Sequence, residues 1–120
     1  MAINSKQKGA AGERELSHFL GKFGFCARRS QQYAGANGDA DVVGVPGLHI
    51  ECKRVERLNI DNALAQATKD ARDGEIPIVF HRKNRTKWKV TLSADLFMYI
   101  YIIFMEATGE LKGDNSGQGK

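Results

Sequence analysis

The chain has 120 residues, of which 42% are hydrophobic and 27% are charged. This length suffices for one domain with a single core and is too short for two, and the composition is that of a soluble globular protein. Eighteen Lys and Arg residues against fourteen Asp and Glu residues give a net charge of +4. Such a surplus suits a polyanionic partner, although basic proteins without one are equally common.

The sequence pattern predicts neither export nor membrane insertion. Residues 1–8 are polar and lead directly into a helical pattern, unlike a signal peptide. The longest apolar run, residues 96–104, is about half of the roughly twenty residues that a membrane helix needs. Cys26 and Cys52 lack the spacing of a zinc site and are expected to be small buried residues. We therefore expect a cytoplasmic protein without a membrane partner.

A first helix is predicted over residues 5–23, because apolar side chains recur at helical spacing from Leu16 to Phe23. Glu13 lies one turn before Leu16, at the edge of this apolar stripe. A carboxylate in that position is either a metal ligand or a surface residue in an ion pair. The helical pattern alone leaves both interpretations open.

A short strand is predicted over residues 25–29, since Gly24 ends the helix. The strand delivers three polar side chains to its end that are expected to contact DNA, those of Arg28, Arg29 and Ser30. Residues 31–38 are small or polar, have no periodicity and are expected to form a loop. Tyr33 in this loop offers a stacking face to a nucleic-acid strand, although loops of this composition are commonly only connectors.

A hairpin is predicted over residues 41–53, where two β-rich runs flank Pro46 and Gly47, a pair that favours a tight reversal. Side chains alternate between the two faces of a strand. Glu51 and Lys53 therefore share one face of the second strand. The intervening side chains face the other way and can join a core.

Asp41, Glu51 and Lys53 together suit a divalent metal ion and a phosphate. Magnesium usually takes one or two carboxylates, with waters and substrate phosphate oxygens completing its shell. A nearby lysine can steady the attacking water or the charge that develops on phosphorus. A Glu-x-Lys tripeptide is common on solvated strands, but Asp41, brought in across the hairpin, favours the metal site.

A second helix is predicted after Asn59 or Asp61, either of which can serve as its N-cap. Its apolar stripe begins at Ile60, and Gly74 is expected to end it. The same pattern places Gln66 on the exposed face of the helix.

A second hairpin is predicted from two strands, residues 76–81 and 88–92. From Arg82 to Lys89 there are five basic residues and no acidic one, with Trp88 among them. A solvated hairpin tip explains this composition, yet basic residues interleaved with an aromatic one are well suited to a phosphate backbone. The side chains expected to contact DNA here are Arg82, Lys83, Arg85 and Lys87, together with Arg54 after the first hairpin.

The last segment, residues 96–105, follows a cap at Ser93 or Asp95 and is apolar on most sides, which predicts burial on more than one face. A central strand or a helix held between the sheet and a partner subunit would satisfy this pattern. Beyond it the chain has little to bury. We expect one domain over residues 1–108 and a disordered tail over 109–120.

Residues 6–92 resemble the PD-(D/E)xK nucleases, and within them the archaeal-type Holliday junction resolvases and their phage relatives. Residues 8–16 look like the first helix of this family with its metal-associated glutamate, Glu13, and residues 24–30 look like the next strand with its serine near the active site. Three side chains fall on the core motif, those of Asp41, Glu51 and Lys53. Gln66 lies where related nucleases often carry a glutamine. Ala40 replaces the family's proline before Asp41, and Asp39 is an alternative ligand.

The resemblance implies an α/β domain with a mixed central β-sheet flanked by helices, as in restriction endonucleases, and a helical last segment. It implies a DNA endonuclease that uses Mg²⁺, or Mn²⁺, to hydrolyse phosphodiesters in four-way junctions. The implied metal ligands are Asp41, Glu51 and the Cys52 carbonyl, with Glu13 completing the site. Lys53 would orient the nucleophile or stabilise charge.

The implied partner is branched DNA, and we expect a homodimer. Resolution of a junction requires two cuts, which two-fold related active sites provide most simply, and residues 96–104 are expected in the interface. Three alternatives remain: a nuclease of this type acting on another DNA structure, as in repair or restriction, a non-catalytic DNA-binding protein, and a structural protein.

Overall fold

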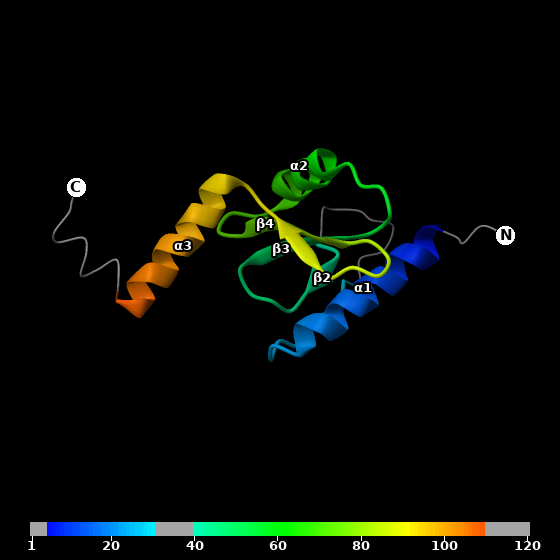
Figure 1. Cartoon of the computed structure of the whole chain (residues 1–120), viewed down its shortest axis with the longest axis horizontal. Helices are drawn as coiled ribbons and strands as arrows, with labels where there is room; N and C mark the ends of the chain where they lie inside the picture. The colour runs from blue at the N-terminus through cyan, green and yellow to red at the C-terminus, as the bar shows by residue number, and fades with distance from the viewer. Residues whose placement is uncertain (1–4, 31–39, 110–120) are drawn as a thin grey trace.

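The structure is a computed structural model that describes residues 5–30 and 40–109, with the side chains of residues 5–8 left out (Figure 1). Its elements are, in chain order, α1 (Ser5–Gly21), β1 (Arg28–Arg29), β2 (Val42–Val43), β3 (Leu48–Arg54), α2 (Ile60–Asp70), β4 (Ile76–Arg82), β5 (Lys89–Thr91) and α3 (Ala94–Thr108). The strands form one sheet in the order β1-β2-β3-β4-β5.

The sheet is mixed. Strands β3 and β4 pair in parallel, with Glu51 opposite Val79, and α2 makes the crossover between them. The pairs β1–β2, β2–β3 and β4–β5 are antiparallel, so both predicted hairpins are present. The prediction of an α/β fold with a mixed central sheet and flanking helices is confirmed.

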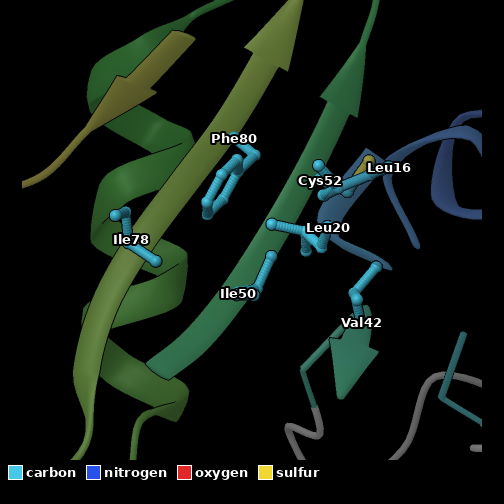
Figure 2. Close-up of a cluster of buried hydrophobic side chains, with 7 residues drawn as sticks. All are labelled: Leu16, Leu20, Val42, Ile50, Cys52, Ile78 and Phe80. Carbon is cyan, nitrogen blue, oxygen red and sulfur yellow. The ribbon is translucent and has the colours of Figure 1, made fainter. Parts of the chain in front are cut away.

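Helix α1 covers one face of the sheet, and the main hydrophobic core lies beneath it (Figure 2). The buried side chains of this cluster are Leu16, Leu20, Val42, Ile50, Cys52, Ile78 and Phe80. Leu16, Val42 and Ile50 are inaccessible to solvent, and each such side chain contributes roughly 1.5–3 kcal/mol by its burial. This packing fixes α1 over the centre of β3.

Helix α2 covers the opposite face through small side chains. Ala63 and Ala67 pack against Val79 of β4, which brings the helix close to the sheet. The predicted cap is confirmed, because the Asn59 side chain accepts a hydrogen bond from the Asn62 backbone at 3.0 Å. The helix ends at Asp70 and not at Gly74, since the backbone is already extended at residue 71.

The segment between α1 and the sheet departs from the prediction. Helix α1 ends at Gly21, where a tight turn begins with hydrogen bonds to carbonyls three residues back. This turn carries Phe23 out of the apolar stripe and leaves it 65% exposed. The predicted strand is reduced to two residues, and Cys26, expected to be buried, is exposed. These differences arise because α1 ends at Gly21 and β1 begins only at Arg28, which leaves Phe23 and Cys26 in the connecting segment.

The backbone of this segment lies close to the first hairpin. Gly44 has φ of +103°, and a Cβ there would collide with the carbonyl oxygen of Cys26. A side chain at this position is therefore excluded twice, by the left-handed backbone and by the neighbouring chain.

Helix α3 confirms the helical last segment. Ser93 caps it by accepting a hydrogen bond from the Leu96 backbone at 3.2 Å, and Gly109 ends it in the left-handed conformation. The helix projects from the domain on the side away from α1 (Figure 1). The expected burial is not found within this chain, because the eight large apolar side chains from Phe97 to Phe104 are each between 38% and 58% exposed.

Two further expectations can be compared with the fold. In the part of the chain that the structure describes, no helix has the length and apolar character needed to cross a membrane. The predicted disordered tail, residues 109–120, lies outside the described residues except for Gly109, which is the C-cap of α3.

Candidate active site

Glu51 and Lys53 lie on β3 and point to the α2 face, as the strand alternation predicted. Glu51 is opposite Val79 in the sheet, and Val79 packs against α2. Cys52, between them, points into the core beneath α1. Glu51 is 9% exposed, so its carboxylate has little contact with water, which is unusual for an ionisable side chain.

Asp41, which immediately precedes β2, is fastened to β3 by two hydrogen bonds. Its backbone N–H donates to the Ile50 carbonyl at 2.9 Å, and its side-chain Oδ2 accepts from the Cys52 N–H at 2.8 Å. The antiparallel hairpin thus places the carboxylate of Asp41 next to the backbone between Glu51 and Lys53. The three residues of the predicted motif are brought together.

The surroundings of the site raise the pKa of both carboxylates. Burial, and then the nearby Asp41 carboxylate, raise the pKa of Glu51 to about 7, while Lys53 opposes this shift. Burial raises the pKa of Asp41 as well, against the lowering effect of the hydrogen bond from Cys52. A bound cation would relieve both the desolvation and the repulsion, so this donor set fits a divalent metal ion.

The sulfur of Cys52 is unsuited to such an ion. Burial, followed by the surrounding carboxylates, raises the pKa of its thiol far above the usual range. The thiol therefore stays protonated, and a protonated thiol is a poor metal ligand. Among the atoms of Cys52, its backbone carbonyl is the one suited to a hard cation.

Glu13 reaches the margin of this site from α1. Its charge contributes to the raised pKa values of Asp41 and Glu51, and its Oε1 lies 3.0 Å from Nε of Arg29. Gly12 allows α1 to lie close to the end of β3, since a Cβ at residue 12 would lie 2.6 Å from Cβ of Arg54. In residues 5–30 and 40–109, no three His, Cys, Asp or Glu side chains are arranged to hold a metal ion by themselves. The arrangement suits two carboxylates completed by water and phosphate oxygens.

Gln66 lies on the exposed face of α2, as predicted, and lines the same surface hollow as Lys53. Its Nε2 donates to Oδ2 of Asp70 at 2.6 Å. Asp70 in turn raises the pKa of Glu51. Gln66 therefore lies at the rim of the candidate site. Its hydrogen-bond partner, Asp70, acts electrostatically on Glu51 within that site.

The remaining predicted residues near β1 are partly placed. Arg28 and Arg29 are exposed on β1, and the backbone N–H of Ser30 donates to the Asp41 carbonyl at 3.0 Å. Ser30 thus follows the strand directly beside the site. Tyr33 and Asp39 lie outside the described residues, so the choice between Asp39 and Asp41 as ligand remains a prediction.

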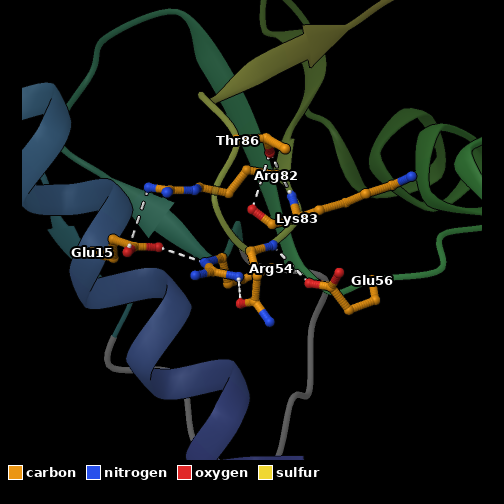
Figure 3. A network of polar contacts seen from close by, with 7 residues as sticks. Glu15, Arg54, Glu56, Arg82, Lys83 and Thr86 are labelled. Carbon is orange, nitrogen blue, oxygen red and sulfur yellow. Dashed lines mark hydrogen bonds and ion pairs between the residues drawn. The ribbon is translucent and has the colours of Figure 1, made fainter.

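The basic turn between β4 and β5 has acidic partners that the sequence pattern did not reveal (Figure 3). Glu15 of α1 pairs with Nε of Arg54 at 2.8 Å and with Nη1 of Arg82 at 3.5 Å. Arg82 also stacks over Trp88, 5.6 Å from the ring centroid. Residues 82–89 include no acidic side chain of their own, but Glu15 of α1 supplies one to Arg82.

Glu56 provides the second acidic contact. Its Oε2 accepts from the backbone N–H of Asn84 at 2.6 Å, and the side chain of Asn84 accepts from Arg54 at 2.9 Å. These contacts fix the turn against the end of β3. The three basic side chains that stay exposed on the turn are Lys83, Arg85 and Lys87.

Comparisons with known proteins agree with this geometry at the level of the fold. No protein-family model and no curated protein sequence matches the chain. Its structure is similar to that of Hjc, a Holliday junction resolvase from the archaeal hyperthermophile Archaeoglobus fulgidus, with a TM-score of 0.56 and 28% identity. The match covers 71% of this chain and 72% of Hjc. Hjc belongs to the PD-(D/E)xK nuclease superfamily, so the likeness supports a nuclease of the resolvase type; a relationship to phage resolvases stays a prediction.

Proposed function

We propose that this protein is a metal-dependent DNA endonuclease that resolves four-way junctions. The observation that carries the proposal is the arrangement of Glu51 and Lys53 on β3 with Asp41, immediately before β2, held beside Glu51 by the Cys52 backbone. The likeness to Hjc supports the substrate class. Neither feature alone would distinguish a nuclease from another basic α/β domain.

The proposed metal ligands are Asp41, Glu51 and the carbonyl of Cys52, with Glu13 at the margin of the site. When bound there, Mg²⁺ or Mn²⁺ would supply an activated water and neutralise charge on the scissile phosphate. The two carboxylates hold the position for the cation within a partly desolvated sheet. Lys53, on the same face as Glu51, orients the attacking water or stabilises the negative charge that develops on phosphorus.

DNA is held through its backbone in this proposal. Lys83, Arg85 and Lys87 present three exposed positive charges on a turn that its own acidic contacts keep in place. Arg28 and Arg29 provide two more on β1, close to Glu13. Contacts to phosphate position a protein on DNA without reading bases. A nuclease built this way selects its substrate by shape, which suits branched DNA.

We propose further that the enzyme is a homodimer and that α3 contributes to its interface. A junction is resolved by two cuts, and one chain of this size provides one set of the motif residues. Helix α3 projects from the domain (Figure 1), and its eight large apolar side chains from Phe97 to Phe104 are all partly exposed. A second copy, which carries the same surface, would bury them in a self-complementary contact.

The test is a cleavage assay on a synthetic four-way junction, a flap and a linear duplex, with and without Mg²⁺ or Mn²⁺. We expect metal-dependent cleavage of the junction and little cleavage of the duplex. Glu51→Gln should abolish cleavage while junction binding persists, because it removes a ligand charge at almost constant volume. Asp61→Asn, a similar loss of charge on an exposed residue of α2, is the control.

Two outcomes would redirect the proposal. Preferential cleavage of the flap or the duplex would retain the chemistry and assign the enzyme to another DNA structure. A protein that binds the junction but cuts none of these substrates with either metal would be a DNA-binding module with an inactive site.

A further inference from the structure

A basic groove lies between α1 and β1, on the side of the molecule where the chain leaves the helix and enters the sheet. We call it the α1–β1 groove, and the residues that line it are Arg14, Ser17, His18, Gly21, Lys22, Ala27, Arg28 and Arg29. Its volume is about 820 Å³. None of these lining residues is acidic, and five of them carry basic side chains.

Three of the lining residues are small, namely Ser17, Gly21 and Ala27, and we call them the floor of the α1–β1 groove. Ser17 and Gly21 lie one turn apart on α1, and Ala27 faces them from the segment before β1. A Cβ added at Gly21 would meet no atom within 4 Å. The floor therefore leaves room for a ligand that approaches the backbone of the helix.

The walls of the groove are basic on both sides. Arg14 and His18 are four residues apart on the exposed surface of α1, so they lie one turn from each other, and the exposed Lys22 follows in the turn after Gly21. Arg28 and Arg29 face them from β1, and both are exposed. A groove with arginine and lysine side chains on both sides and no acidic residue in its lining suits the charge of a phosphate backbone.

The groove adjoins Glu13, at the margin of the candidate active site. Arg29 lines the groove and also donates from Nε to Glu13, whose charge acts on Asp41 and Glu51. Ser17 in the floor donates to the backbone carbonyl of Glu13 at 2.8 Å. A DNA strand lying in the groove would therefore pass close to Glu13, at the margin of the candidate site.

We infer that the α1–β1 groove binds the phosphate backbone of a duplex DNA arm that leads away from the cut site. This inference rests on the proposed function for the identity of the ligand, and it adds a binding surface on α1, in particular His18, Lys22 and the opening at Gly21. The basic turn between β4 and β5 is a separate surface, joined to α1 through Glu15. The two surfaces give the protein separate contacts to DNA on either side of α1.

Binding of DNA in the groove can be tested by placing a negative charge among its basic side chains. Gly21→Glu places a carboxylate among the basic side chains, and the open space at this position lets the fold accommodate it. We expect this variant to bind duplex and junction DNA several-fold more weakly than the parent protein, while Gly21→Lys binds more tightly. Lys22→Gln should lower the slope of log affinity against log salt by about one. The measurement is fluorescence anisotropy without divalent metal, so that no DNA is cut.

The control is Ala65→Glu, which adds the same charge at an exposed position of α2, on the opposite face of the sheet. It should change DNA affinity much less than Gly21→Glu, and circular dichroism should show the parent's helical signal in all four variants. Equal weakening by the two Glu variants would reduce the effect to net charge and overturn the groove. Unchanged affinity in Gly21→Glu and an unchanged salt slope in Lys22→Gln would overturn it as well.

The outcome is independent of catalysis. If the Gly21 variants change binding as expected while the protein cuts no DNA, the groove stands and the nuclease proposal fails. If the parent cuts junctions in a metal-dependent way but the variants bind normally, the nuclease proposal stands and the groove fails. A parent protein that binds no DNA at low salt would overturn both.

Discussion

Oδ2 of Asp41 accepts a hydrogen bond from the backbone N–H of Cys52, over 2.8 Å between the two heavy atoms. The bond fixes a carboxylate against β3 next to Glu51, whose pKa it helps to raise by its negative charge. Without a cation the two groups repel each other in a partly buried place. The geometry of the hairpin is thus kept at the expense of stability in the metal-free protein, a common feature of functional sites.

The first prediction concerns pH and the metal-free fold. Because the pKa of Glu51 rises from 4.5 to about 7 on folding, the native state holds a proton in that interval that the unfolded state has lost. Stability should fall as pH rises from about 4.5 to about 7, by on the order of 1–3 kcal/mol from this group. Glu51→Gln should therefore raise the melting temperature at about pH 8 and have little effect near pH 4.5.

The increase in melting temperature that a divalent metal produces should grow as the pH rises. Protons and the cation compete for Glu51, so Mg²⁺ or Mn²⁺ should raise the melting temperature of the parent more at about pH 8 than at about pH 5. The rise should be absent in Glu51→Gln. An equal rise in the variant would show that the ion binds elsewhere in the protein.

The second prediction separates metal binding from chemistry at Lys53. Lys53→Ala should lose cleavage of the junction and retain the increase in melting temperature that Mg²⁺ produces, since Lys53 acts on the nucleophile or phosphate and not on the ion. Lys69→Ala, a change of the same kind on the exposed surface of α2, is the control and should leave cleavage intact. Full activity in Lys53→Ala would return Lys53 to an ordinary solvated strand residue.

Local sequence signals predicted the elements that carry this site. Pro46 and Gly47 marked the turn that aligns Asp41 with β3, and Asn59 marked the start of α2. Strand alternation predicted the common face of Glu51 and Lys53. Each of these features depends on residues that are close in the sequence, so a pattern within a short window was sufficient.

The features that the sequence did not reveal depend on distant residues or on a partner. Glu15 and Arg54 are 39 positions apart, and only the packing of α1 over β3 makes them an ion pair. Phe23 fits the helical period, but the turn after Gly21 carries it into solvent. The α1–β1 groove likewise requires α1 and β1 to be placed side by side before its basic lining can be recognised.

The third prediction revises the role of the basic turn. Charge-neutral changes at Lys83 and Arg85 should weaken binding to all forms of DNA about equally and lower the slope of affinity against salt. Arg82→Gln should mainly reduce stability, because Arg82 is bound to Glu15 and stacked on Trp88. Salt titration of DNA affinity and thermal unfolding distinguish the two effects. An unchanged salt slope in the Lys83 and Arg85 variants would show that the turn does not contact phosphate.

The fourth prediction is that the protein sediments as a dimer at micromolar concentration and that α3 forms part of the interface. The rings of Phe97 and Tyr101 stack at a centroid distance of 6.3 Å, and the ring of Phe104 lies tilted to that of Tyr101 at 6.4 Å, so the three contact one another along the helix. Together with Ile100 they form an exposed apolar surface of a kind that monomeric proteins rarely leave in contact with water. Aromatic side chains are also enriched at the centres of subunit interfaces. A second copy is the partner that a two-cut reaction requires.

Ile100→Asp and Tyr101→Asp test the contribution of α3 directly. Both side chains are exposed in the single chain, so the charge should leave the domain folded and produce a monomer with the parent's circular dichroism spectrum. Ala107→Asp, near the end of the same helix, should remain dimeric because it removes no large apolar side chain. Loss of the folded domain in the first two variants would mean that α3 packs into its own core. A parent protein that is monomeric at micromolar concentration and still resolves junctions would refute the dimer, because one chain would then make both cuts.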